Sequence, residues 1–162
     1  MDYFFSAHEV ATLAAEMESR GVVFYKHLQR IAGDTTISNM CAFFAAQEQE
    51  HQDKFLAIAE AFRTSESEQC YSVDVCAMLN ASMLDLERLL DSKPSPERSL
   101  VLVSDGLAIA AGAEATAINV FMKMKDRYTA NFTSVLTGML GEERKHLRMI
   151  QFVQARLRPA DL

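Results

Sequence analysis

The sequence has 162 residues, which is enough for one domain with a substantial core. Apolar residues make up 49% and charged residues 23%, a balance typical of a globular protein and not of a disordered or fibrous one. The net charge of −6 argues against a nucleic-acid partner and against binding to an anionic membrane surface, because both need clustered Lys and Arg.

Five helical segments are predicted, and the first two are long. The first covers about residues 6–31, with Ser6 as N-cap and Glu9 three residues later, the pattern of a capping box. It ends at Gly33-Asp34, and the second covers about 35–62. Ala, Leu, Met, Glu and Gln are abundant while strand-like alternation is scarce, which indicates an all-α fold.

A shorter helix is predicted over about 73–90, followed by a helix breaker at 92–97. Pro96 suits the start of a helix over about 97–125, and the last helix covers about 131–157. The four long helices thus form two hairpins with short turns. About thirty residues join the hairpins, enough for a crossover connection that carries the short extra helix along a four-helix bundle. A single domain spanning residues 1–162 is expected.

Each long helix carries an apolar stripe that is interrupted in its middle. Steps of alternately three and four residues trace one face of a helix, and on these faces the middle positions are acidic or histidine. Two of the helices carry Glu-x-x-His. The polar residues in the four stripes are Glu18, Glu48, His51, Glu114, Glu143 and His146.

These six residues predict a metal site. A buried charge costs several kcal/mol unless it is paired or coordinates a cation, and no Lys or Arg lies on the four stripes. Residues three apart differ by about 60° around a helix and about 4.5 Å along it, so Glu and His can reach one metal or two neighbouring ones. Four carboxylates would balance two divalent ions. Oxygen and imidazole ligands suit iron or manganese, with zinc possible.

The spacing of the glutamates forms an internal repeat. Glu18 precedes Glu48 by 30 residues and Glu114 precedes Glu143 by 29, so two similar hairpins would face each other across a pseudo-twofold axis.

Glu142 lies off the stripe and is expected to be exposed, although it could replace Glu143 if the helix were locally irregular.

The N-terminal ten residues contain no basic segment and no long apolar run, so no signal peptide is predicted. The apolar stretch 106–113 is too short to cross a bilayer. Three cysteines without a Cys-x-x-Cys pair suit a reducing compartment. We therefore expect a cytoplasmic protein without a membrane partner.

The sequence resembles the rubrerythrin family of ferritin-like di-iron proteins over about residues 6–157. The motifs that carry the resemblance are A-x-x-x-E-x-x-G-x-x-F-Y at Ala14–Tyr25, E-x-x-H at Glu48–His51, L-A-I-A-x-x-x-E at Leu107–Glu114, and E-x-x-H at Glu143–His146.

The resemblance implies a non-haem di-iron site that reacts with hydrogen peroxide or dioxygen, often in a homodimer. In such a site Glu48 and Glu143 would bridge two iron ions, and each histidine would bind one of them. Glu18 and Glu114 would be terminal ligands. Tyr25 is similar to a tyrosine of the family that hydrogen-bonds a ligand carboxylate.

The sequence also departs from the family pattern. Typical rubrerythrins carry a rubredoxin domain with Cys-x-x-Cys pairs, and these residues contain no such pair, so an external electron donor protein is expected. Peroxidase-type members have a further glutamate one turn after the third-helix ligand, where this chain has Ala117. Phe121 stands where many members have a second tyrosine.

Three functions are compatible with the sequence. The first is a di-iron oxidoreductase that reduces hydrogen peroxide or dioxygen. The second is an iron-handling protein, similar to a ferroxidase, that oxidises Fe(II) only while sequestering it. The third is a metal-free helical interaction module, which the buried carboxylates disfavour.

Overall fold

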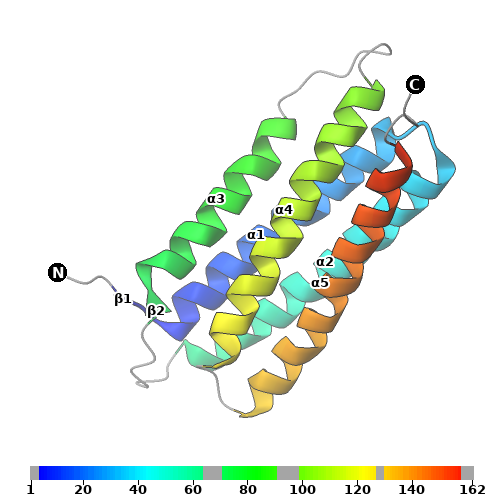
Figure 1. Ribbon diagram of the computed structural model, residues 1–162. Coiled ribbons are helices and arrows are strands. Elements are labelled where there is room, and N and C mark those ends of the chain that lie inside the picture. Colours follow the sequence, from blue (N-terminus) through cyan, green and yellow to red (C-terminus); the bar gives the residue numbers. More distant parts are fainter. Residues whose placement is uncertain (1–3, 64–70, 91–98, 127–129, 158–162) are drawn as a thin grey trace.

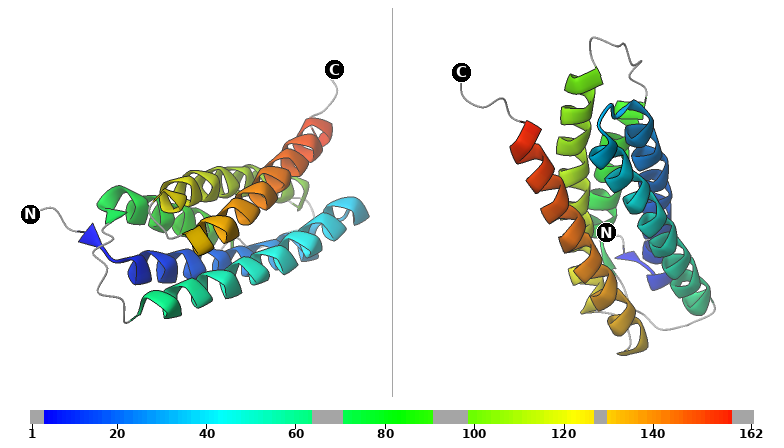
Figure 2. Two further views of the ribbon diagram at one scale, coloured as in Figure 1. Left: turned by 90° about the horizontal axis from the view of Figure 1, so that it is seen from below. Right: turned by 90° about the vertical axis from the view of Figure 1, so that its right-hand side faces the viewer.

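The computed structural model describes residues 4–63, 71–90, 99–126 and 130–157. Four long helices run roughly along one direction, and a shorter helix lies beside them (Figures 1 and 2). The helices are α1 (Ala7–Ile31), α2 (Thr35–Phe62), α3 (Val73–Leu90), α4 (Ser99–Lys125) and α5 (Ala130–Leu157). The predicted all-α, four-helix bundle with a crossover helix is confirmed. The predicted first residues of α4, 97–98, lie outside the described residues.

The first hairpin is defined by caps that satisfy backbone groups at the helix ends. The Ser6 hydroxyl accepts a hydrogen bond from the Glu9 amide at 3.2 Å, and the Glu9 carboxylate accepts one from the Ser6 amide at 2.8 Å, so the predicted capping box is present. The Asp34 side chain caps α2 by accepting a bond from the Ile37 amide at 3.0 Å. These caps place the end of α1 and the start of α2 only a few residues apart.

The connecting helix α3 covers one side of the bundle. Helix α1 packs chiefly against α2, and α4 against α5, while α3 packs against both α1 and α4. Ion pairs between Arg20 and Glu87 and between Lys123 and Asp74 join α3 to α1 and α4 at the surface. Helices α2 and α5, in contrast, make few contacts with each other.

A short β-pairing that the sequence did not predict lies at the N-terminal side of the bundle. Strand β1 (Phe4–Phe5) pairs antiparallel with β2 (Tyr71–Ser72), with Phe4 opposite Ser72 and Phe5 opposite Tyr71. Because α3 begins at Val73, the pairing ties the chain before α1 to the chain before α3. Two residues per strand leave the fold class unchanged.

The core consists of two apolar clusters, one on each side of the polar residues in the helix middles. One cluster contains Phe55, Phe121 and Leu136, and the other contains Phe24 and Phe44. Along each long helix the predicted polar position falls between residues of the first cluster and residues of the second. The apolar stripes thus bury the polar layer at the centre of the bundle.

One stretch among the described residues, Val103–Lys125 of α4, is long and apolar enough by length and composition to cross a membrane. A core helix of a bundle meets the same criterion. This helix carries Glu114 in its middle and packs against α3 and α5. We take it as a core helix of the bundle.

Candidate metal site

The six polar residues of the stripes meet in one buried layer. Their exposed fractions are 4% or less, although all six can carry charge. Each comes from the middle of α1, α2, α4 or α5, where the apolar periodicity directs one face of the helix toward the bundle axis. The predicted burial of this layer is confirmed, and the role of these residues as metal ligands stays a prediction.

The buried layer contains two overlapping groups of potential metal ligands. In each group one ligand atom per residue lies within 4.8 Å of all the others. The first, which we call the His51 set, consists of Glu18, Glu48, His51 and Glu143, and the second, the His146 set, consists of Glu48, Glu114, Glu143 and His146. Glu48 and Glu143 belong to both sets. This arrangement can hold two ions that share two carboxylates.

Several potential ligand atoms in this layer lack the hydrogen bond that burial normally requires. Glu18 Oε1, both carboxylate oxygens of Glu143, and Nδ1 of His51 and of His146 are buried without a hydrogen-bond partner. Glu143 Oε1 is 2.7 Å from His51 Nδ1, within ion-pair distance but outside hydrogen-bond geometry. Unsatisfied oxygen and nitrogen atoms gathered in one buried layer fit a bound cation.

The outer nitrogens of the two histidines are held by residues from the opposite hairpin. Nε2 of His51 lies 2.8 Å from Oε2 of Glu142, and Nε2 of His146 lies 3.1 Å from Oε1 of Gln47. A proton on Nε2 leaves Nδ1 with the lone pair that a metal needs, so both partners favour the ligating tautomer. Gln47 and Glu142 each stand one residue before a predicted ligand.

The expectation that Glu142 is exposed is wrong. Its side chain is 29% exposed, contacts His51, and lies 3.5 Å from Nζ of Lys54. The alternative in which Glu142 replaces Glu143 is also not what the structure shows, since Glu143 is 1% exposed and belongs to both ligand sets. Glu142 supports a histidine of the site instead of joining the two sets.

Tyr25 contacts the cluster as the family resemblance implied. Its hydroxyl donates a short hydrogen bond to Oε1 of Glu114, and its ring packs edge-on against Phe24 and Phe44. Burial, together with the charges of Glu114 and Glu48, raises the pKa of Tyr25 well above its usual range. The hydroxyl therefore keeps its proton and acts as a donor.

Gly21 of the family motif allows α1 to approach Glu48 closely. A Cβ atom at this position would lie 3.3 Å from Cγ of Glu48, closer than ordinary van der Waals contact. Glycine inside a helix costs about 1 kcal/mol relative to alanine. The close approach gives this glycine a role at the site, since it frees space beside a carboxylate that both ligand sets share.

Without a metal, the cluster balances its charge by binding protons. Burial, strengthened by the neighbouring carboxylates, raises the pKa of Glu18 and of Glu114 well above the ordinary value. Burial alone would lower the pKa of the histidines, but contacts with Glu143 and other carboxylates raise it to about 10 for His51. Contacts with Glu114 and other carboxylates raise it to about 12 for His146.

The pKa values of the two shared carboxylates, Glu48 and Glu143, are lowered, in contrast to those of Glu18 and Glu114. Burial acts to raise the pKa of Glu48 and of Glu143, but close contacts with neighbouring carboxyl groups and with both histidines lower it. Two carboxylates then face two imidazoliums, with Glu18 and Glu114 neutral. Metal ions would replace these protons, since a ligand must be deprotonated to bind.

A cavity of about 20 Å³ lies beside the cluster. All four carboxylates of the two sets line it, together with Tyr25 and the apolar side chains of Leu86 and Ala117. This volume is sufficient for one water-sized molecule. Ala117, where peroxidase-type relatives carry a glutamate, is buried and offers the cluster no ligand atom.

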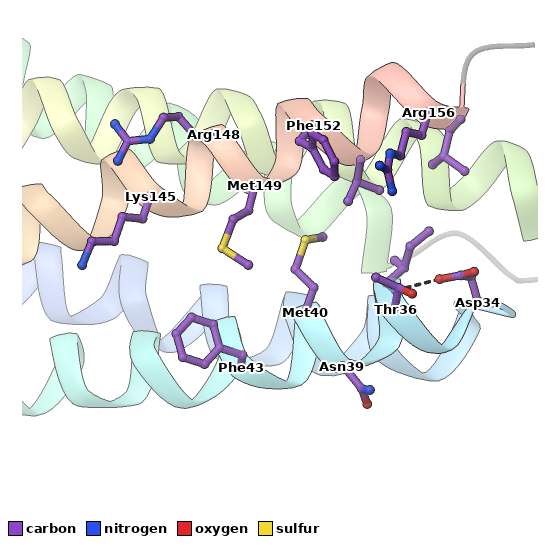
Figure 3. A pocket seen from close by; sticks show the side chains of 13 residues that line it. Asp34, Thr36, Asn39, Met40, Phe43, Lys145, Arg148, Met149, Phe152 and Arg156 are labelled. Carbon is purple, nitrogen blue, oxygen red and sulfur yellow. Dashed lines mark hydrogen bonds between the residues drawn. The ribbon is translucent and has the colours of Figure 1, made fainter. Parts of the chain in front are cut away.

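A separate groove of about 960 Å³ runs between α2 and α5, which make few contacts with each other (Figure 3). Met40 and Phe43 of α2 face Met149 and Phe152 of α5 across it, and cationic side chains of α5 line its rim. Phe43 is half exposed, and its ring lies edge-on to that of His146 with 6.2 Å between centroids. Phe43 therefore contacts both the groove and a histidine of the buried layer.

The fold and the site define an all-α, ferritin-like bundle with a buried cluster of carboxylates and histidines at its centre. The family model for rubrerythrin matches residues 9–154. The chain therefore belongs to the rubrerythrin family. Comparison with curated proteins and with solved structures gave no match.

Proposed function

We propose that this protein is a non-haem di-iron oxidoreductase that reduces hydrogen peroxide or dioxygen with electrons from a separate donor protein. The observation that carries the proposal is the set of buried ligand atoms without hydrogen bonds in the middle of the bundle. Membership of the rubrerythrin family supports the same chemistry. Oxygen and nitrogen donors without a thiolate suit iron, although manganese and zinc are possible.

Two bound Fe(II) ions would supply the two electrons that, with two protons, reduce one hydrogen peroxide molecule to two water molecules. The residues of the chain have three tasks in this reaction. Glu48 and Glu143 would hold both ions, because each belongs to both ligand sets. Tyr25 holds a proton at the hydroxyl beside Glu114. The fully buried Phe44 and Phe55 keep bulk water away from the two sides of the layer.

The small cavity is a candidate position for the oxidant. Carboxylates line it together with the apolar Leu86 and Ala117, and its volume of about 20 Å³ favours a molecule close to water in size, such as peroxide or dioxygen, over anything larger. A small oxidant would thus be selected by size. Larger peroxides would have to displace side chains of the core to reach the same place.

The second candidate function is iron handling, in which Fe(II) is oxidised without sustained turnover. The observation that favours it is Ala117, which is buried at the cavity and provides no exchangeable carboxylate. A fixed ligand set would stabilise the charge of the diferric form less well and slow its reaction cycle. Ferroxidase-like activity needs only one oxidation per pair of ions.

The partners and location also remain proposals. A homodimer in the cytoplasm is proposed, without nucleic acid or membrane as a partner. The described cysteines, Cys41 and Cys76, are buried and free, which is compatible with a reducing compartment.

Steady-state turnover separates the two functions. Protein loaded anaerobically with two Fe(II) per chain is given excess hydrogen peroxide and a soluble one-electron reductant, and peroxide loss is followed. An oxidoreductase consumes many equivalents, whereas an iron-handling protein stops after about one per pair of ions. A Glu143→Gln variant, which lacks a shared carboxylate, is the control for free-iron chemistry and should show no site-dependent consumption. Equal rates in wild type and control would contradict both functions.

Ala117→Glu tests the role of the missing carboxylate. We expect faster reoxidation of the diferrous variant by peroxide in stopped-flow measurements, because the added ligand can follow the change in metal charge. If wild type is already fast and the substitution changes nothing, the site does not need ligand exchange. In that case Ala117 does not limit turnover, and it no longer favours the iron-handling function.

A further inference from the structure

The outer partners of the two histidines break the symmetry of the internal repeat. Because Glu48 corresponds to Glu143 in the repeat, Gln47 corresponds to Glu142. Each contacts the histidine of the opposite hairpin through an equivalent atom, at 3.1 Å for Gln47 and 2.8 Å for Glu142. One of the two partners is a neutral amide and the other a carboxylate. A carboxylate increases the electron density that an imidazole offers a metal more than an amide does.

The aromatic residues of the repeat break the symmetry a second time. Tyr25 and Phe121 each follow a ligand glutamate of the first or third long helix by seven residues. The Tyr25 hydroxyl donates to Glu114 and so withdraws electron density from a ligand of the His146 set. Phe121 has no group to donate, and Glu18 Oε1 in the His51 set has no hydrogen-bond partner. Once a metal displaces the carboxyl proton of Glu18, no hydrogen bond at Oε1 withdraws electron density from that oxygen.

Both differences act in the same direction. The His51 set has a carboxylate behind its histidine and a glutamate whose Oε1 accepts no hydrogen bond, whereas the His146 set has an amide behind its histidine and a glutamate that accepts a bond from Tyr25. We propose that the two metal positions are inequivalent, and that the His51 set binds the first divalent ion and binds it more tightly. This inference rests on the di-metal site of the proposed function.

Lys54 partly offsets the effect of the Glu142 carboxylate on His51. Its ammonium group lies 3.5 Å from the same Glu142 oxygen that contacts His51. Its side chain is 35% exposed, so water and salt screen its charge. Replacing it should strengthen the asymmetry, which gives a test independent of any change at Glu142 itself.

Anaerobic calorimetric titration with Fe(II) measures the two affinities. Wild type should show two steps, and anomalous diffraction from crystals holding one equivalent of iron should place the ion in the His51 set. Glu142→Gln makes the outer partners alike and should weaken the first step by about tenfold to a hundredfold, so that the steps merge. Gln47→Glu, the matched variant, should leave the first step unchanged and tighten the second by a similar factor.

Lys54→Met should tighten the first step only. A purely structural role for Glu142 would instead weaken both steps together, and circular dichroism of each variant checks that the bundle is folded. Two ions bound with one affinity by wild type, or a first ion in the His146 set, would overturn the inference and leave the di-metal site intact. Absence of Fe(II) binding in wild type would overturn the inference together with the proposed function.

Discussion

The hydroxyl of Tyr25 on α1 donates a hydrogen bond to Oε1 of Glu114 on α4, 89 residues later in the chain. The bond crosses from the first hairpin to the second inside the polar layer. Tyr25 thus positions Glu114, a predicted ligand in the His146 set, while its ring belongs to the apolar cluster around Phe44. One side chain serves both the packing of the bundle and the candidate metal site.

Tyr25→Phe should lower the free energy of unfolding of the metal-free protein by about 1–3 kcal/mol. The substitution keeps the ring and removes only the donor, which leaves a buried oxygen of Glu114 unsatisfied. Urea unfolding with a chelator present measures the difference. A variant as stable as wild type would contradict the contribution of this bond.

Gly21→Ala should weaken metal binding although alanine favours the helix. The added methyl group would press on Cγ of Glu48, a carboxylate of both ligand sets, and displace it by a few tenths of an ångström. Gly112→Ala on α4 is the matched control, because a Cβ there meets nothing within 4 Å. We expect the control to gain up to about 1 kcal/mol in stability with unchanged affinity. Equal affinities in the two variants would show that Glu48 adapts freely.

The metal-free protein should become less stable as the pH rises from about 6.5 to 10. The folded-state pKa of His51 is raised to about 10 and that of His146 to about 12 from an ordinary value of 6.5. In this range the native state binds more protons than the unfolded state, so stability decreases by about 1.4 kcal/mol per pH unit for each extra proton. The lowered pKa values of Glu48 and Glu143 predict a separate loss of stability below about pH 4.5.

Urea unfolding of chelator-treated protein at several pH values measures this dependence. Metal-loaded protein should show the reverse trend between pH 6.5 and 8, since bound ions replace the protons and their binding strengthens as the ligands deprotonate. Removal of the metal at neutral pH should therefore lower the melting temperature. Flat and superimposable profiles, with metal loss verified, would be incompatible with the protonation scheme.

Phe43→Ala should speed the release of bound metal to a chelator. The Phe43 ring lines the groove along α2 and α5 and also contacts the ring of His146, so its removal should expose this histidine on the groove side. Phe152→Ala is the control, because this residue lines the same groove and its ring contacts Arg156. The release rate follows from the absorbance of the chelator complex. Equal rates for both variants would mean that metal does not leave through the groove.

The sequence predicts the fold and the polar layer well because one physical cause determines both. Apolar residues at helical spacing bury one face of each helix, and the positions of Glu18, Glu114 and His51 on that face follow directly. The helix bounds are near those predicted because Ser6 and Asp34 provide recognisable caps.

The roles of Glu142 and Gln47 were not predicted, for a geometric reason. A residue one position before a predicted ligand lies about 100° away around the helix. It therefore falls off the apolar stripe, and its side chain is expected to face solvent. Whether such a side chain reaches the histidine of another helix depends on how α2 packs against α5. The residue spacing within a single helix gives no information about this packing. The pairing of Phe4–Phe5 with Tyr71–Ser72 depends in the same way on tertiary structure. The sequence did contain one indication of these roles, because Gln47 and Glu142 occupy equivalent positions of the internal repeat, each directly before a shared glutamate.

We propose that six residues in the middle of the bundle hold two iron ions. Anomalous diffraction at the iron edge, from crystals of protein reconstituted anaerobically with Fe(II), tests it most directly. We predict two peaks about 3–4 Å apart between Glu48 and Glu143, one beside Nδ1 of His51 and the other beside Nδ1 of His146. Ordered carboxylates bonded to one another and to water, with no anomalous peak among them after reconstitution, would contradict the claim.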